Sequence, residues 1–163
     1  SYTPAANKNG ISRITVTVTD AGRDGTLGTE DDATFSRYFT VSVLGVTLSV
    51  WEDPAPIANG STLDFGSGAA GSSMVKTLVL TNTGASALTL DPNSLLLPSG
   101  FTLLSEFPES LDAQVSANLT VSLDTTQPGS YGGELSFTNS DFRNSPFHVQ
   151  LQATVTGGEI GSF

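Results

Sequence analysis

The acidic segment between Asp20 and Asp32 holds the residue types that point most directly to chemistry. It reads Asp-Ala-Gly-Arg-Asp-Gly-Thr-Leu-Gly-Thr-Glu-Asp-Asp, so five acids and three glycines fall within 13 residues. Ca²⁺ is bound by about six to eight oxygens from carboxylates, carbonyls and water, and glycines let backbone carbonyls turn toward an ion. The segment therefore predicts a calcium-binding loop. Its candidate ligands are Asp20, Asp24, Glu30, Asp31 and Asp32.

The spacing of these acids differs from that of an EF-hand, which would also need a helix on each side. It is similar to the Asp/Gly-rich loops of bacterial surface repeats. A second interpretation is a solvated acidic hairpin tip that needs no ion and keeps the sheet edge soluble. Arg23 would neutralise part of the charge and lower the affinity for a cation.

Two aromatic residues are candidates for stacking on a sugar ring. Trp51 stands beside Glu52-Asp53-Pro54, and Tyr38 lies on the polar face of its strand. If exposed, they would form an aromatic platform for a glycan. The interpretation that we favour for Trp51 is structural: its indole fills the junction between an N-terminal hairpin and the domain that follows.

The ionisable residues do not predict a catalytic site. His148 is the only histidine, and its place between Phe147 and Val149 predicts a surface residue that faces away from the core. No second group is positioned by the sequence to form a triad with it. Paired carboxylates can hydrolyse glycosides, but no acidic pair lies on an identifiable cleft strand. We therefore predict that the chain is not an enzyme.

The composition favours strands and turns over helices and excludes several classes of partner. Serine and threonine number 21 each among 163 residues, with 17 glycines and 8 prolines. The net charge of -10 opposes binding to nucleic acid. The absence of cysteine excludes disulfides, thiolate catalysis and zinc-thiolate clusters. Apolar runs are far shorter than the ~18 residues of a membrane span.

Period-two alternation of apolar and polar residues recurs along the chain and predicts an all-β protein. The clearest run is 115–123, with apolar residues at odd positions and mostly hydroxyl or amide residues between them. Similar runs cover 131–137 and 147–155, each after a turn sequence. Shorter strands are predicted at 46–50, 63–65, 74–81, 88–90, 95–97 and 101–104.

These strands predict an immunoglobulin-like antiparallel β-sandwich over residues 47–157, because about seven or eight strands are typical of that fold. Residues 1–46 instead predict a partial immunoglobulin-like unit, a β-hairpin with strands near 14–18 and 35–43 joined by the acidic loop. Two strands cannot bury both faces, so the apolar face of this hairpin needs a partner. Residues 158–163 are predicted to be a tail or linker.

The segment from Leu63 to Thr156 resembles a choice-of-anchor D domain. The resemblance lies in Leu63-Asp64-Phe65-Gly66, Leu80-Thr81-Asn82-Thr83-Gly84 with Leu88-Thr89-Leu90, Gly129-Ser130-Tyr131-Gly132-Gly133-Glu134-Leu135, and Asn139-Ser140-Asp141 with Ser145-Pro146-Phe147. This family is related to the abnormal-spindle and hydin-type immunoglobulin-like domains. It implies a PapD-like sandwich that serves as a non-catalytic module of large bacterial extracellular proteins.

The chain departs from this family in its turns. The family usually has a Pro-Gly turn where this chain has Asp112-Ala113-Gln114, and a phenylalanine and a proline where it has Leu123 and Thr125. The first segment, residues 2–19, resembles the final strands of cadherin-like or other immunoglobulin-like repeats of bacterial adhesins. That resemblance implies that the upstream strands of the unit were lost, cut away or are supplied by another chain.

The sequence thus predicts a structural or adhesive module located outside the cell or on its surface. The predicted partners are other copies of the chain or neighbouring immunoglobulin-like domains, which would assemble a filament or lattice by β-strand addition. The start at Ser1, without an initiator methionine or a secretory signal, indicates a mature product or a piece of a longer chain. The alternative is a carbohydrate-binding module that uses Trp51 or Tyr38.

Overall fold

The computed structural model describes residues 3, 5 and 8–157, and its contacts divide the chain into two compact units, 1–45 and 46–163. Both units are built from strands, and the described residues contain one helix, the three-residue 3₁₀ turn η1 (Pro92–Ser94). The predicted all-β, immunoglobulin-like class is confirmed. The predicted tail at 158–163 lies outside the described residues, as do residues 1–2, 4 and 6–7.

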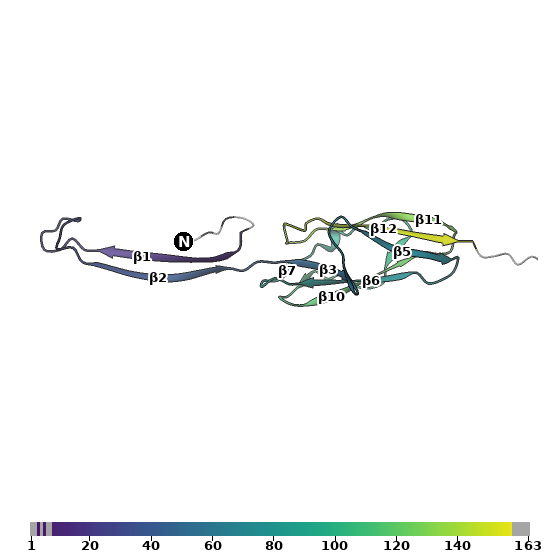
Figure 1. The fold of residues 1–163 in the computed structure, drawn as a ribbon, viewed down its shortest axis with the longest axis horizontal. Coiled ribbons are helices and arrows are strands. Elements are labelled where there is room, and N and C mark those ends of the chain that lie inside the picture. Colours follow the sequence, from purple (N-terminus) through teal and green to yellow (C-terminus); the bar gives the residue numbers. More distant parts are fainter. Residues whose placement is uncertain (1–2, 4, 6–7, 158–163) are drawn as a thin grey trace, which may run out of the picture. The chain divides into compact units, whose positions relative to one another are not determined.

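The first unit is an antiparallel hairpin of β1 (Gly10–Thr19) and β2 (Thr34–Val43), drawn in purple and dark blue in Figure 1. Ten residue pairs form an uninterrupted ladder between the two strands. The alternation seen in the sequence therefore becomes two faces, one mainly apolar and one rich in hydroxyl groups. The acidic segment predicted to bind calcium closes this hairpin.

The second unit is a sandwich whose two main sheets lie one above the other in Figure 1. One sheet has the order β4-β3-β6-β10-β8 and the other the order β11-β12-β5, and a small β7-β9 pair lies beside them. The strands of this unit are β3 (Leu48–Glu52), β4 (Ala55–Pro56), β5 (Thr62–Ala69), β6 (Val75–Asn82), β7 (Leu88–Thr89), β8 (Phe101–Leu103), β9 (Ser110–Leu111), β10 (Ser116–Leu123), β11 (Gly129–Phe137) and β12 (Phe147–Thr156).

The core of the sandwich is filled by the apolar side chains that alternate along these strands. In β10, Leu119, Val121 and Leu123 are buried, whereas the residues between them lie on the outer face. Phe137 is fully buried and meets the Phe107 ring edge to face at 5.2 Å between centroids. The sandwich therefore closes its own core, as the strand pattern predicts.

The pairing of the strands differs from the expectation in two places. β5 runs parallel to β12, with Leu63 opposite Leu151, in an otherwise antiparallel arrangement. The strand predicted at 95–97 is wrong, since only Leu96 pairs there, in an isolated bridge to Ser136 after the η1 turn. The two-residue strands β4 and β9 are too short to leave a periodic signal.

Asn82, one of the residues that carry the resemblance, has a structural role. Its side chain is fully buried and donates to the carbonyls of Ser86 and Leu111 at 2.7 and 2.9 Å, while its Oδ1 accepts the Gly84 N–H at 3.0 Å. A buried amide is stable only when its polar atoms are paired in this way. Asn82 thus holds the turn after β6 against the β9 segment.

Asp141 closes the loop between β11 and β12 in a similar way. Its buried carboxylate accepts the backbone N–H groups of Leu48 and Arg143 at 3.0 and 3.1 Å and the Asn144 side-chain amide at 2.9 Å. The bond to Leu48 attaches the first strand of the sandwich to this loop. Both motif residues therefore build the fold and are not free for chemistry.

Gln114 accounts for one departure from the resembled family. Its φ of 64° lies in the left-handed region, which glycine occupies without strain and other residues rarely adopt. Its side-chain amide donates to the carbonyls of Thr83 and Gly84 at 3.0 Å. These two bonds offset the backbone cost and keep a tight turn without glycine.

Candidate functional site

The acidic loop is organised by hydrogen bonds from the backbone to carboxylates. Asp20 Oδ1 accepts the N–H groups of Gly22 and Ala33, both at 3.0 Å. The Ala33 bond, followed by the Gly22 bond, holds the pKa of Asp20 below its usual value. Asp20 therefore closes the end of the hairpin ladder through its side chain.

Asp31 is the second centre of this loop. Its Oδ2 accepts the Arg23 N–H at 2.6 Å, and its Oδ1 accepts the Thr29 hydroxyl at 2.9 Å. The Arg23 amide is the largest cause of the lowered pKa of Asp31. Gly22 permits this arrangement, because a Cβ there would lie 2.5 Å from the Asp31 carboxyl carbon. The glycine admits a carboxylate, not the carbonyl ligands expected for an ion.

The remaining acids of the loop do not complete a metal-ligand cluster. Asp24 Oδ1 accepts the Thr26 N–H at 2.8 Å, Asp32 Oδ2 accepts the Gly28 N–H at 2.5 Å, and Glu30 is exposed. In the part of the chain that the structure describes, no three His, Cys, Asp or Glu side chains are placed to hold a metal ion. The five acids share one loop, and calcium binding stays a prediction.

The two candidate sugar-binding aromatics lie in different units. Tyr38 is 62% exposed on the hydroxyl-rich face of the hairpin, and the Arg13 guanidinium covers its ring at 3.6 Å from the centroid. Trp51 is 41% exposed on the outer face of the five-stranded sheet, and its indole N–H donates to Ser49 Oγ at 2.8 Å. The side chain of Trp51 is thus partly open to solvent.

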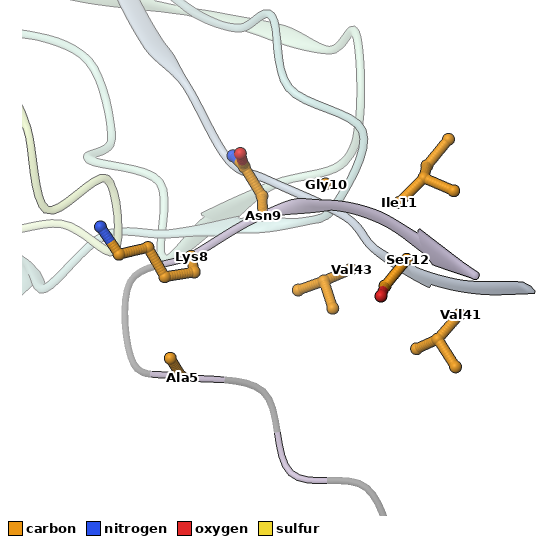
Figure 2. Close-up of a pocket in the computed structure, with 8 residues that line it drawn as sticks. All are labelled: Ala5, Lys8, Asn9, Gly10, Ile11, Ser12, Val41 and Val43. Carbon is orange, nitrogen blue, oxygen red and sulfur yellow. The ribbon is translucent and has the colours of Figure 1, made fainter. Parts of the chain in front are cut away.

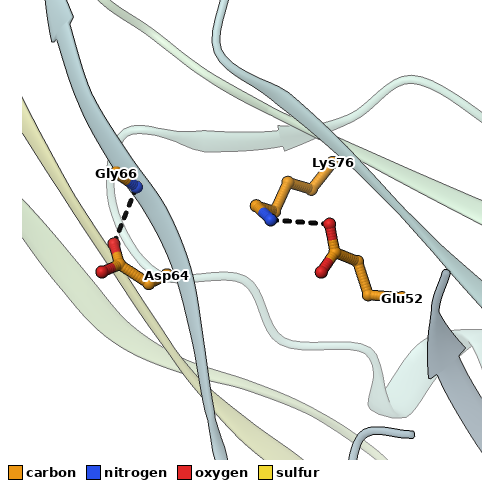
Figure 3. Close-up of polar contacts among 4 residues, drawn as sticks. All are labelled: Glu52, Asp64, Gly66 and Lys76. Atoms are coloured by element: carbon orange, nitrogen blue, oxygen red, sulfur yellow. Dashed lines mark hydrogen bonds and ion pairs between the residues drawn. The ribbon is translucent and has the colours of Figure 1, made fainter. Parts of the chain in front are cut away.

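The side chains with acid-base capacity are dispersed. His148 faces away from the core as predicted, but it is partly buried, and its backbone N–H donates to Asn59 Oδ1 at 2.9 Å. Glu52 is engaged by Lys76 at 2.6 Å, the one ion pair among the described residues (Figure 3). None of these contacts links a nucleophile to a base. Within the described residues, no helix is long and apolar enough to cross a membrane.

The hairpin differs from the sandwich in that apolar side chains on one face of its sheet are exposed. Val16, Val18, Phe35 and Phe39 on this face are 51–62% exposed. The described part of this unit has two strands, so no second layer within it covers these side chains. Contiguous exposed apolar surface of this kind marks an interaction site.

The base of the hairpin continues the same face. Figure 2 shows Ser12, Val41 and Val43 on one side of the ribbon and Ile11 on the other. The hollow there measures about 210 Å³ and is lined by short side chains together with Lys8. The described residues of its lining include no acid and no histidine, and most of them are apolar or uncharged.

Among the described residues of that unit, no strand pairs with the outer edges of the hairpin. The Asp20 N–H donates to the Ala33 carbonyl at 3.0 Å, so these two residues form a hydrogen-bonded pair. Hydrogen-bonded and non-hydrogen-bonded pairs alternate along an antiparallel ladder, and the pairs on the apolar face, such as Val16 with Arg37, are therefore hydrogen-bonded pairs. The backbone groups of the apolar-face residues therefore point inward, to the other strand. Those that point to the free edge of β2 belong to Thr34, Ser36, Tyr38, Thr40 and Ser42.

The edge strands of the sandwich are short, bulged or partly covered. β8 and β4 are three and two residues long, and β11 is covered at Ser136 by Leu96. β5 contains a β-bulge, and Asp64 Oδ1 accepts the Gly66 N–H at 2.7 Å (Figure 3). Short edge strands, bulges and covering loops are the devices by which sheets avoid further pairing. The ten-residue strands of the hairpin have no bulge and no proline.

No family model matches the sequence, and no curated protein matches it. Among solved structures, the chain is similar to a protein of unknown function from Porphyromonas gingivalis W83. The two are 14% identical with a TM-score of 0.52, over 93% of this chain and 68% of that one. At this identity the similarity shows the fold alone.

Two further structures are similar at lower scores. One is the ASH/PapD-like domain 7 of human CEP192, with 14% identity and a TM-score of 0.49 over 69% of this chain and 87% of that one. The other is the VesB protease of Vibrio cholerae, with 18% identity and a TM-score of 0.45 over 61% of this chain and 31% of that one.

The carboxylate bonds of the loop predict a pH dependence. Because folding lowers the pKa of Asp20, its ionised carboxylate stabilises the folded loop at pH values above the ordinary aspartate pKa of about 3.9. This stabilisation is lost as the pH falls through the pKa that Asp20 has in the folded loop. We expect the Ala33 and Gly22 amide resonances to move together below about pH 4 in an NMR titration. Asp20→Asn keeps an oxygen acceptor and should remove the titration while preserving the Ala33 resonance. Asp20→Ala should lose both, and an unchanged Ala33 resonance in that variant would contradict the role given to Asp20.

Proposed function

We propose that this chain is a non-catalytic structural module of a bacterial extracellular or cell-surface protein, joined to its neighbours by β-strand addition at the hairpin. The sandwich is a rigid, self-contained spacer, and the hairpin is a docking element. Repeated between modules or copies, this joint builds a filament or lattice. The resemblance to choice-of-anchor D domains supports the surface location.

The observation that carries this proposal is the contrast between the two units. The sandwich buries the inward apolar side chains of its strands in one core, whereas the described part of the hairpin unit leaves an apolar face and two ten-residue edges open. Each Val or Phe side chain that becomes fully buried would add about 1.5–3 kcal/mol. A hairpin built for solvent alone would not place four such side chains on one face.

The proposal predicts that the hairpin is the less stable unit in the isolated chain. Hydrogen exchange of the hydrogen-bonded amides of Val16 and Phe39 should be at least about 100-fold faster than that of Leu119 and Val121 in β10, since local opening of two strands exposes little buried surface. The measurement is native-state exchange followed by NMR. Hairpin amides as protected as those of β10 in a monomer would show that the hairpin needs no partner.

A core substitution provides the matched control. Val121→Ala should speed exchange throughout the sandwich by removing fully buried methyl groups. It should leave the exchange of Val16 unchanged, because the core that contains Val121 is formed by residues of the second unit. Equal acceleration in both units would contradict the view that the sandwich folds as its own unit.

Calcium at the hairpin tip is part of the proposal. Its support is Asp32 Oδ1, which is shielded from solvent and has no hydrogen-bond partner among the described residues. An ion that binds only the folded form stabilises it by linkage, about 2.7 kcal/mol at a hundredfold excess over Kd. We expect the hairpin to melt at a higher temperature in Ca²⁺ than in a chelator, and Asp32→Asn to abolish the difference. Equal midpoints in the unsubstituted chain would exclude the ion.

Carbohydrate binding is the second candidate function, and the exposure of Trp51 favours it. Across the five-stranded sheet, Trp51 lies opposite Val79, which in turn lies opposite Asn118. An exposed indole on a sheet face that also carries hydroxyl and amide groups suits stacking on a sugar ring. Glycan-array binding should disappear in Trp51→Ala and persist in Val75→Ala, which removes another exposed side chain of the second unit. Binding unaffected by Trp51→Ala would reject this function.

A further inference from the structure

Within β1 and β2, Arg37 is the one charged residue on the apolar face. Its guanidinium lies over the Phe35 ring at 4.9 Å from the centroid, and among the described residues it forms no ion pair. The residue opposite it on β1 is Val16. If this face is covered by a second layer, the arginine is buried with it. A buried cation is costly unless an anion accompanies it.

The charge of the hairpin strands differs from that of the rest of the chain. β1 and β2 contain Arg13 and Arg37 and no acid, because all five acids of the first unit lie in the closing loop. Residues 46–163 hold eleven acids against two bases, Lys76 and Arg143. The ladder is thus a locally positive, apolar surface on an acidic chain, and it attracts a partner of negative charge.

The geometry of β2 defines where that negative charge must lie. The backbone groups of Ser36 and Tyr38 point to the free edge, so an added strand would hydrogen-bond to them and leave its residue opposite Arg37 in a non-hydrogen-bonded pair. Side chains in such pairs are close, with Cα atoms about 4.5 Å apart. A residue opposite Arg37 also projects to the apolar face, because facing residues share a face.

We propose that the free edge of β2 accepts a strand from a neighbouring immunoglobulin-like module, and that this strand alternates apolar with hydroxyl residues and places a Glu or Asp opposite Arg37. The proposal rests on the docking role proposed for the hairpin. Main-chain hydrogen bonds to the β2 edge would supply the affinity. The alternating apolar residues of the added strand and its one carboxylate would fix which of its residues lies opposite Arg37.

A second copy of the chain fits this edge less well. A second hairpin would bring another Arg37 and no acid to the ladder. The long edge strand of a second copy, β11, is bridged by Leu96 only at Ser136, and its one acid, Glu134, shares a face with Gly132 and serines instead of apolar residues. The described strands of a second copy therefore do not supply the required pattern.

The test uses the full chain and two synthetic peptides of identical composition. The first, Thr-Val-Thr-Val-Thr-Glu-Thr-Val-Thr, pairs antiparallel with residues 34–42 and places its Glu opposite Arg37. The second exchanges this Glu with the Thr that follows it, which moves the carboxylate to the hydroxyl-rich face. Amide titration and hydrogen exchange of Ser36, Tyr38 and Thr40 report binding at the β2 edge.

We expect the first peptide to bind about tenfold more tightly than the second and to slow exchange of these three amides. Arg37→Glu should reverse this preference, and a peptide with Lys in place of Glu should restore tight binding to that variant. Arg13→Glu makes the same change in net charge on the opposite face and should leave the preference intact. Equal binding of both peptides, or binding of neither, would overturn the proposal.

Two other outcomes separate this inference from the proposed function. In the first outcome, protection of the β2 amides from exchange rises with protein concentration and the peptide does not compete. This result would identify a second copy as the occupant, which would overturn the inference but leave the docking role of the hairpin intact. Hairpin amides that are as protected as those of the sandwich in a monomer would overturn the docking role itself.

Discussion

A β-sheet with one apolar face needs another layer to cover it, and the architecture of this chain follows from that constraint. In the second unit, the alternating residues of β10 and β12 meet across the sandwich, so that Leu119 and Val149 are fully buried. In the first unit the same alternation has nothing opposite it, and Val18 and Phe35 remain exposed. One sequence pattern thus yields a closed core in one unit and an open face in the other.

The treatment of sheet edges follows the same division. The sandwich shortens, bulges or covers its edge strands, which limits pairing to the strands it already has. The hairpin presents ten-residue edges whose outward backbone groups belong to hydroxyl residues and Tyr38, while its apolar side chains share one face. An unprotected edge beside an uncovered apolar face is the arrangement that strand addition uses, and for this reason the hairpin, not a pocket, is the candidate site.

Polar side chains in this protein mainly satisfy the backbone. The Asn82 amide donates and the Asp141 carboxylate accepts bonds that hold turns of the sandwich. The carboxylates of Asp20 and Asp31 accept backbone N–H groups in the hairpin loop. These polar residues, which the sequence alone would also allow as ligands, form turns in the structure. Arg37 is the exception, since it lies on an apolar face without an anion, and its placement is what gives the open face a chemical preference.

Period-two alternation alone was enough to predict the all-β class, the hairpin and the long strands β6, β10, β11 and β12, because each strand displays its two faces along its own sequence. Alternation does not say which strand lies next to which, so the parallel pairing of β5 with β12 and the lone bridge at Leu96 were decided only by tertiary structure. The exposure of Trp51 and the engagement of Asp31 by the Arg23 amide were decided there too. The physical reason is the same in each case: a side chain carries its own chemistry, but its neighbours determine whether that chemistry is already satisfied.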